Sequence, residues 1–171
     1  TIPAIDEFGQ SNLVDYEDKI KSFEQLQSEW KNEENEPFDA NAYNYSKYGG
    51  YKQKKVNATG FFRTGQIDGK WWLVDPEGYL FLSVGVDCIH PSPGGLAKEV
   101  DKRENMFKEL PPRDLFPGNN SHPDDYSFGL WNLYRRYGED YRDKANEMVI
   151  RRMEKWGINT IANWSSFEIM N

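Results

Sequence analysis

The first third of the chain is polar, and its few apolar side chains predict one helix. Residues 16–30 carry apolar side chains three or four positions apart, which is the spacing of one helix face. These are Ile20, Phe23, Leu26 and Trp30. Ser22 and Gln25 have the spacing of a capping box, which would start the helix later. Residues 41–55, with four tyrosines and two glycines, are predicted to form an irregular segment that packs on a larger body.

The middle of the chain predicts three strands joined by tight turns. Residues 61–67 and 70–74 flank Asp68-Gly69, and this pair suits a type I′ turn because both central residues of such a turn have positive φ. A second turn is predicted at 75–78, where proline presets φ and glycine takes the left-handed position. The third strand, 79–86, is apolar without alternation, which is typical of a strand covered on both faces.

Two helices and a second buried strand are predicted in the second half of the chain. One helix covers 96–110, and the other covers 140–156 and ends before Gly157, a typical C-cap residue. Residues 158–164 form the second buried strand, and the rest of 87–138 is predicted to be a long surface loop. A buried strand, a crossover with a helix and another buried strand make a βαβ unit. The sequence therefore predicts an α/β fold.

The amino-acid composition and the net charge narrow the classes of function that fit this chain. Phe, Tyr and Trp make up 15% of the chain while hydrophobic residues total only 37%, so we expect a core built mainly from aromatic rings. A net charge of −7 argues against nucleic-acid binding. The sequence has no run apolar enough for a membrane span, and a single cysteine, Cys88, excludes a disulfide framework. An acidic, aromatic-rich chain fits neutral polar ligands, of which sugars are the obvious class.

Two segments of the sequence carry a family resemblance. The first contains Phe61-Phe62-Arg63, the run Ile-Asp-Gly-Lys-Trp-Trp-Leu-Val-Asp-Pro-Glu-Gly at 67–78, and Phe-Leu-Ser-Val-Gly-Val at 81–86. The second is Met-Glu-Lys-Trp-Gly-Ile-Asn-Thr at 153–160. Together they resemble the entry to the catalytic barrel of β-agarase-like glycoside hydrolases, the family 50 type within clan A.

The resemblance implies a (β/α)8 TIM barrel that hydrolyses O-glycosidic bonds with retention, using one glutamate as acid/base and another as nucleophile. It places those glutamates at the ends of the fourth and seventh strands. Residues 58–171 would be the start of this barrel, a floor hairpin and the first βαβ unit, truncated after the second strand. Residues 1–57 would precede it as a helical and irregular segment. Glu168 matches neither glutamate, so we assign no catalytic residue and expect this chain alone to be inactive.

The resemblance also implies partners and a location. The substrate would be an oligo- or polysaccharide, and the protein would be secreted or periplasmic. The remaining part of the barrel is expected as a partner, in the same protein or as another chain, because two strands cannot close a sheet. We expect no cofactor and no metal, because the candidate ligands lack the spacing of a zinc or calcium site. These candidates are Asp87, Cys88, His90, His122, Asp124 and Asp125.

Four residues at the carboxyl ends of the two buried strands are the predicted substrate-binding residues. Asp87 and His90 leave the first strand, and Asn163 and Trp164 leave the second. Ligands of parallel α/β folds bind at this edge. Asp87 and His90 would bind sugar hydroxyls, and Trp164 would stack on a sugar ring. The structural alternatives are a turn cap for Asp87, a loop position for His90 and a core position for Trp164.

Two other functions fit the same sequence. A complete noncatalytic carbohydrate-binding module would place the three middle strands in a β-sandwich with tryptophans as the platform, although the helix at 140–156 argues against it. A structural interaction domain is the third interpretation, because no catalytic residue is recognisable. Trp71 and Trp72 point to opposite faces of their strand, and at least one of them, like Trp156, is predicted to pack in the interior.

Overall fold

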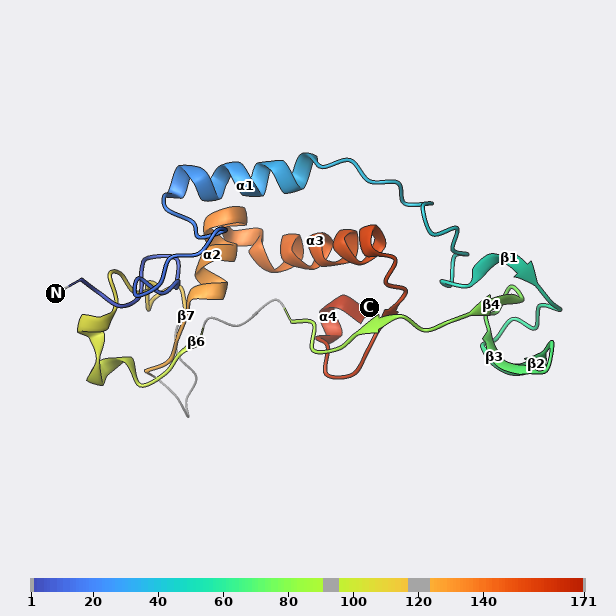
Figure 1. Ribbon diagram of the computed structural model, residues 1–171. Coiled ribbons are helices and arrows are strands. Elements are labelled where there is room, and N and C mark those ends of the chain that lie inside the picture. The colour runs from blue at the N-terminus through green and yellow to red at the C-terminus, as the bar shows by residue number, and fades with distance from the viewer. Residues whose placement is uncertain (1, 91–95, 117–123, 171) are drawn as a thin grey trace. The chain divides into compact units, whose positions relative to one another are not determined.

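The computed structural model describes residues 2–90, 96–116 and 124–170. The chain divides into two compact units (Figure 1). Unit 1 comprises Thr1–Glu36 and His90–Asn146, and unit 2 comprises Pro37–Ile89 and Glu147–Asn171. Both contain helices and short strands, and no sheet closes into a barrel within the described ranges. The fold is therefore mixed α/β, as predicted. No helix in these ranges is both long enough and apolar enough to cross a membrane.

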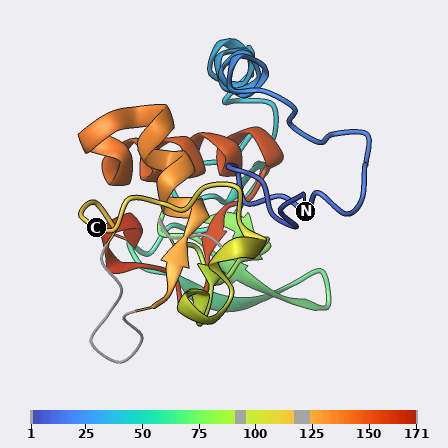
Figure 2. The same ribbon diagram turned by 90° about the vertical axis from the view of Figure 1, so that its left-hand side faces the viewer.

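Unit 1 is mostly helical. Its helices are α1 (Phe23–Asn35), α2 (Phe128–Tyr137) and the first turns of α3 (Tyr141–Trp156). Its antiparallel strands are β6 (Leu96–Ala97) and β7 (Tyr126–Ser127). Three 3₁₀ turns complete the unit: η1 (Val100–Lys102), η2 (Glu104–Met106) and η3 (Gly138–Asp140). Figure 2 shows β7 leading directly into α2.

Helix α1 begins at the capping residues that the sequence offered. Ser22 Oγ accepts a hydrogen bond from the Gln25 amide at 3.2 Å, and Gln25 Oε1 accepts one from the Lys21 amide at 2.9 Å. The later start is thus confirmed and the start at residue 16 is wrong. The reason is that the Ile20 amide donates to the Gln10 side chain at 3.0 Å, which fixes the preceding turn in the N-terminal loop.

Arg136 fastens α1 to α2. Its side chain is only 6% exposed and binds the carboxylates of Glu33 at 2.7 Å and Glu34 at 3.1 Å. It also donates to the Trp30 carbonyl at 3.2 Å. Because α1 itself has no buried residue, these polar contacts are a main attachment of the helix to α2.

The core of unit 1 is aromatic, as the composition predicted. Phe116, Phe128 and Trp131 form its buried cluster. Phe107 stacks on Phe128 with 6.0 Å between ring centroids. Ile5 joins this cluster from the N-terminal segment, where its amide donates to the Met106 carbonyl at 2.9 Å.

Two predictions for unit 1 were wrong. The predicted helix over 96–110 is replaced by β6, η1 and η2, because Glu99 (φ 48°) and Arg103 (φ −152°) leave the helical region. Conversely, α2 lies within the stretch predicted as loop. Its apolar residues 128, 131 and 134 do recur at helical spacing, and Ser127 caps it by accepting from the Leu130 amide.

Unit 2 contains a four-stranded antiparallel sheet of order β1-β4-β3-β2. Its strands are β1 (Tyr51–Lys55), β2 (Arg63–Ile67), β3 (Lys70–Val74) and β4 (Tyr79–Phe81). The predicted hairpin is confirmed: β2 pairs with β3, and Asp68 (φ 52°) and Gly69 (φ 77°) make the turn. The second turn is confirmed too, with Gly78 at φ 92°.

Strand β1 corrects the prediction of an irregular segment over 41–55. All five of its side chains are exposed, so no buried face marked it in the sequence. It forms because it pairs with β4, which lies about 25 residues further along the chain, and its lysines suit an edge strand. Within the described ranges no second sheet packs on this one as a β-sandwich, so the binding-module alternative loses its predicted fold.

A parallel strand pair forms the second part of unit 2. β5 (Gly85–Val86) pairs with β8 (Thr160–Ile161) in the register Gly85↔Thr160 and Val86↔Ile161. Of the helices between them in sequence, α3 directly precedes β8; it begins one residue later than predicted, at Tyr141, and ends at Trp156 as predicted. The strand–helix–strand order and the parallel pairing are therefore confirmed.

The burial predicted for the strand at 79–86 is confirmed in its first part, where Leu80 and Phe81 are 4% and 8% exposed, and is wrong beyond it. The strand is broken into β4 and β5, and the side chains of Leu82, Val84 and Val86 are 68%, 42% and 40% exposed. An apolar run indicates which side chains a complete sheet would bury. Among the described strands β5 has only β8 beside it, so these side chains stay exposed. Trp71 (73% exposed) and Trp156 (58% exposed) are likewise outside the core, and only Trp72 is partly buried.

Asn159 fastens the beginning of β5 to the segment before β8. Its Oδ1 accepts from the Val84 amide at 2.9 Å, and its Nδ2 donates to the carbonyls of Leu82 at 2.9 Å and Gly49 at 3.0 Å. Gly157 adopts φ 68° directly after α3, as expected of a C-cap glycine. The Gly-Ile-Asn-Thr run therefore has a structural role: it ends the helix and positions the strand pair.

Candidate functional site

The carboxyl ends of β5 and β8 lie side by side. Beyond the last paired residues, the Cys88 amide donates to the Asn163 carbonyl at 3.0 Å. Asp87 and Asn163 therefore leave neighbouring strands at one edge of the sheet, as the sequence predicted. This edge is the candidate functional site.

Ser165 ties together the two segments that follow these strands. Its side chain is buried, and its Oγ accepts from the Ile89 amide at 3.2 Å and donates to the Ala162 carbonyl at 2.9 Å. The Ser166 amide also donates to the Ile89 carbonyl at 2.8 Å. This role of Ser165 was not predicted from the sequence. The available signal was a small hydroxyl residue just past a predicted strand, where such side chains often bond to nearby backbone.

Two residues at this edge have strained backbone. Cys88 has φ 56° and Trp164 has φ 60°, values that cost about 1–3 kcal/mol for residues other than glycine. Asn163 Oδ1 supports the second of these by accepting from the Trp164 amide at 3.0 Å. Such strain clusters at functional sites. Here it accompanies a Trp164 side chain that is 70% exposed.

Three of the four predicted binding residues are exposed at this edge: Asp87, Asn163 and Trp164. The core alternative for Trp164 was therefore wrong. His90 is exposed as well, and its role in binding stays a prediction. His122, considered as a metal ligand, lies outside the described residues. In the ranges that the structure covers, no three His, Cys, Asp or Glu side chains gather as a metal-binding group.

The side chains at this edge carry groups that are suited to binding a ligand. A carboxylate and an amide side chain offer hydrogen bonds to hydroxyl groups, and an exposed indole offers an apolar plane. Glu168, on the short helix α4 (Phe167–Met170), is also exposed. Retaining hydrolysis needs two carboxyl groups about 5 Å apart, and the family resemblance assigns neither of them to Glu168.

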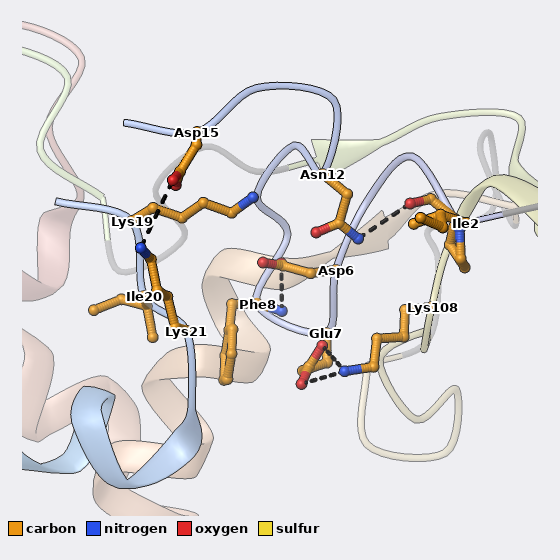
Figure 3. Close-up of a pocket in the computed structure, with 11 residues that line it drawn as sticks. Ile2, Asp6, Glu7, Phe8, Asn12, Asp15, Lys19, Ile20, Lys21 and Lys108 are labelled. Atoms are coloured by element: carbon orange, nitrogen blue, oxygen red, sulfur yellow. Dashed lines mark hydrogen bonds and ion pairs between the residues drawn. The ribbon is translucent and has the colours of Figure 1, made fainter. Parts of the chain in front are cut away.

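A pocket in unit 1 of about 570 Å³ is lined mainly by the N-terminal loop, whose polar groups bond to one another (Figure 3). Buried Asp6 accepts from the amides of Phe8 at 2.9 Å and Gln10 at 2.8 Å. Lys19 donates to the Ser11 carbonyl at 2.8 Å. Because the chain itself satisfies these polar groups, we interpret this pocket as structural.

The ion pair between Glu7 and Lys108 in this pocket predicts that the stability of unit 1 depends on pH. The hydrogen bond from Lys108 lowers the pKa of Glu7, and the same bond raises the pKa of Lys108. Glu7 therefore contributes stability above its unfolded pKa, and this is lost as the pH falls through its lower folded pKa. Lys108 contributes below its unfolded pKa, and this is lost as the pH rises through its higher folded pKa.

We expect Lys108→Met to reduce the loss of stability on acidification, because it removes the main cause that lowers the folded pKa of Glu7. The measurement is the urea midpoint of unfolding at pH 6 and pH 3. Lys31→Met, at an exposed position of α1, is the control and should keep the original pH dependence. An unchanged difference between the two pH values in Lys108→Met would contradict the assignment.

Sequence comparison places the chain beside known enzymes. No protein-family model matches it. It is 31% identical to β-agarase B and 31% identical to β-agarase A, both of Vibrio sp. (strain JT0107). Each match covers 94% of this chain but only 20% and 18% of the respective enzyme. The chain thus spans about a fifth of the length of these relatives.

Structural comparison gives the same result. The agarase AgWH50C matches with a TM-score of 0.81 and 32% identity over 98% of this chain and 28% of its own. A structure described as an exo-β-agarase matches with a TM-score of 0.76 and 34% identity over 95% of this chain and 29% of its own. The resemblance predicted from the two sequence segments is therefore confirmed: nearly the whole chain is similar, in sequence and in fold, to one part of a β-agarase.

Proposed function

We propose that this chain is part of a polysaccharide-degrading, retaining glycoside hydrolase of the β-agarase type, and that it supplies substrate-binding residues but neither catalytic glutamate. The observation that carries the proposal is the carboxyl edge of β5 and β8, where exposed Asp87, Asn163 and Trp164 follow two parallel strands. Ligand sites of α/β folds lie at this edge.

The incomplete sheet supports the barrel assignment. Parallel strands are normally covered on both faces, yet Val86 of β5 is 40% exposed here. We propose that residues 58–171 are the start of a (β/α)8 barrel and that residues 1–57 precede it. The other barrel strands, in the same protein or in another chain, would then cover β5 and β8 and bring the two glutamates.

The substrate follows from the relatives and from the site. Enzymes named as agarases match nearly the whole chain, and the candidate site offers hydrogen-bonding and stacking groups of the kind that sugars need. We therefore propose an oligo- or polysaccharide ligand. A polysaccharide is too large to cross a membrane, which favours a secreted or periplasmic protein. His90 stays in the proposal as a fourth binding residue.

Binding of an agaro-hexasaccharide tests this function. We expect the purified 171-residue chain to bind the sugar without hydrolysing it, and Trp164→Ala to weaken binding about tenfold by removing the stacking plane. Titration calorimetry measures the affinity, and product analysis measures hydrolysis. Trp156→Ala, which removes another exposed indole of unit 2, is the control and should bind as tightly as the unmodified chain.

Two results would contradict the proposal. Unchanged affinity in Trp164→Ala would remove this residue from the site. Hydrolysis by the purified chain would show that it carries its own catalytic groups.

A further inference from the structure

A second hollow of unit 2, which we call the aromatic groove, lies at the amino-terminal end of β5. It has a volume of about 670 Å³, and Leu82 and Val84, just before β5, form part of its wall. The predicted substrate-binding residues follow the opposite, carboxyl ends of β5 and of its partner β8. We define the groove by six of the residues that line it: Tyr43, Tyr45, Tyr51, Trp72, Lys54 and Asp68.

The two tyrosines at one end of the groove are held rigidly. The Tyr43 hydroxyl donates to the Lys155 carbonyl at 3.2 Å, and the Tyr45 hydroxyl donates to the Gly157 carbonyl at 3.0 Å. The two rings stack with 5.9 Å between centroids. Tyr43 also lies directly on Gly157, where an added Cβ would be 2.5 Å from the ring. Because backbone contacts fix these rings, binding a ligand on them costs little side-chain entropy.

The wall formed by β3 presents Trp72 to the groove. Its neighbour Trp71 is 73% exposed and does not line the groove, as expected of adjacent residues on a strand. Charged groups lie beside the rings: Lys54 forms an ion pair with Asp68, and Lys70 also lines the groove. Fixed aromatic rings with a few polar groups are the usual composition of a small-molecule site.

We propose that the aromatic groove binds a neutral oligosaccharide, as a second sugar site separate from the carboxyl edge. A sugar ring has apolar C–H faces for Trp72 and the tyrosines, and hydroxyl groups for Lys54 and Asp68. An apolar protein segment in the same place would take the Lys54–Asp68 ion pair out of water and offer it no further hydrogen bonds, at a cost in free energy. The ligand class rests on the proposed function.

The test uses NMR on the 171-residue chain titrated with an agaro-hexasaccharide, following the indole N–H signals of Trp72 and Trp164. We expect both signals to shift, each with its own saturation curve. Trp72→Ala should weaken binding at the groove about tenfold and leave the Trp164 curve unchanged. Trp71→Ala is the matched control, because it removes the adjacent indole on the other face, and both curves should remain.

A second variant protects the test against a folding defect in Trp72→Ala. Lys54→Met changes an exposed rim position, and the dispersion of amide signals reports whether the fold is kept. We expect it to weaken binding at the groove several-fold while the Trp164 curve stays the same.

The two proposals fail separately. A shift at Trp164 without one at Trp72 overturns the groove and supports the proposed function. A shift at Trp72 alone supports the groove and overturns the carboxyl-edge site. If neither signal shifts, both sugar sites are overturned.

Discussion

Asp75→Ala should lower the unfolding free energy of unit 2 by about 3–4 kcal/mol, because it removes a buried carboxylate that bonds to several groups at once. Asp75 is fully buried, at 0% exposure. One carboxylate oxygen accepts from the amides of Glu77 at 2.9 Å and Tyr79 at 2.8 Å. The other accepts from the hydroxyl of Ser46.

The large effect arises because Asp75 holds two segments together. Its first oxygen shapes the turn between β3 and β4, while Ser46 in turn accepts from the amides of Tyr48 at 3.1 Å and Gly50 at 2.9 Å. Gly50 is packed so closely that an added Cβ would lie 2.2 Å from Asp75 Oδ2. Truncation to alanine therefore leaves buried donors without an acceptor, which costs more than the loss of an ordinary hydrogen bond.

Amide hydrogen exchange measures this effect, because the Tyr79 amide should lose protection together with the rest of β4. Asp68→Asn is the control: Asp68 is an exposed turn aspartate in the adjacent hairpin, and asparagine suits the same positive φ. We expect the control to change stability by less than about 0.5 kcal/mol. A loss of less than about 1 kcal/mol in Asp75→Ala would show that water replaces the carboxylate.

Elements specified by neighbouring residues were predictable from the sequence. The hairpin depends on Asp68-Gly69, and α3 depends on its own periodicity and on Gly157, so both were placed within two residues at each end. β1 was missed because it is stabilised by pairing with β4 rather than by a buried face of its own. The helix predicted over 96–110 was wrong, because the spacing of apolar residues gives no sign of a break such as the left-handed backbone at Glu99.

The candidate site was predictable in position but not in detail. Parallel pairing of two strands fixes which residues leave the same edge, so Asp87 and Asn163 could be placed together from the order of elements. The hydrogen bond that Ser165 accepts from the Ile89 amide could not be predicted, because it joins segments about 75 residues apart. The positive φ of Trp164 could not be predicted either, because this conformation is unusual for the residue type. The aromatic groove was missed for a related reason, since part of its wall is the unpredicted strand β1.

Phe128→Ala should destabilise unit 1 by about 3–5 kcal/mol, the usual cost of removing a large buried ring. Phe128 is 3% exposed, stacks on Phe107 and contacts Trp131 with 6.2 Å between centroids. The N-terminal loop closes over it at Gly9, where an added Cβ would lie 2.7 Å from Phe128. Since Asp6 accepts from the amides of Phe8 and Gln10 on either side of Gly9, this loop has little freedom to move into the cavity.

Amide exchange in α2 and the urea midpoint followed through tryptophan fluorescence measure the loss. Leu13→Ala is the control, because it removes an apolar side chain of the same unit that is 78% exposed, and we expect a change within about 0.5 kcal/mol. A cost below about 1.5 kcal/mol for Phe128→Ala would mean that the neighbouring rings refill the space. The aromatic cluster would then be a core that repacks around a missing ring rather than one that depends on Phe128.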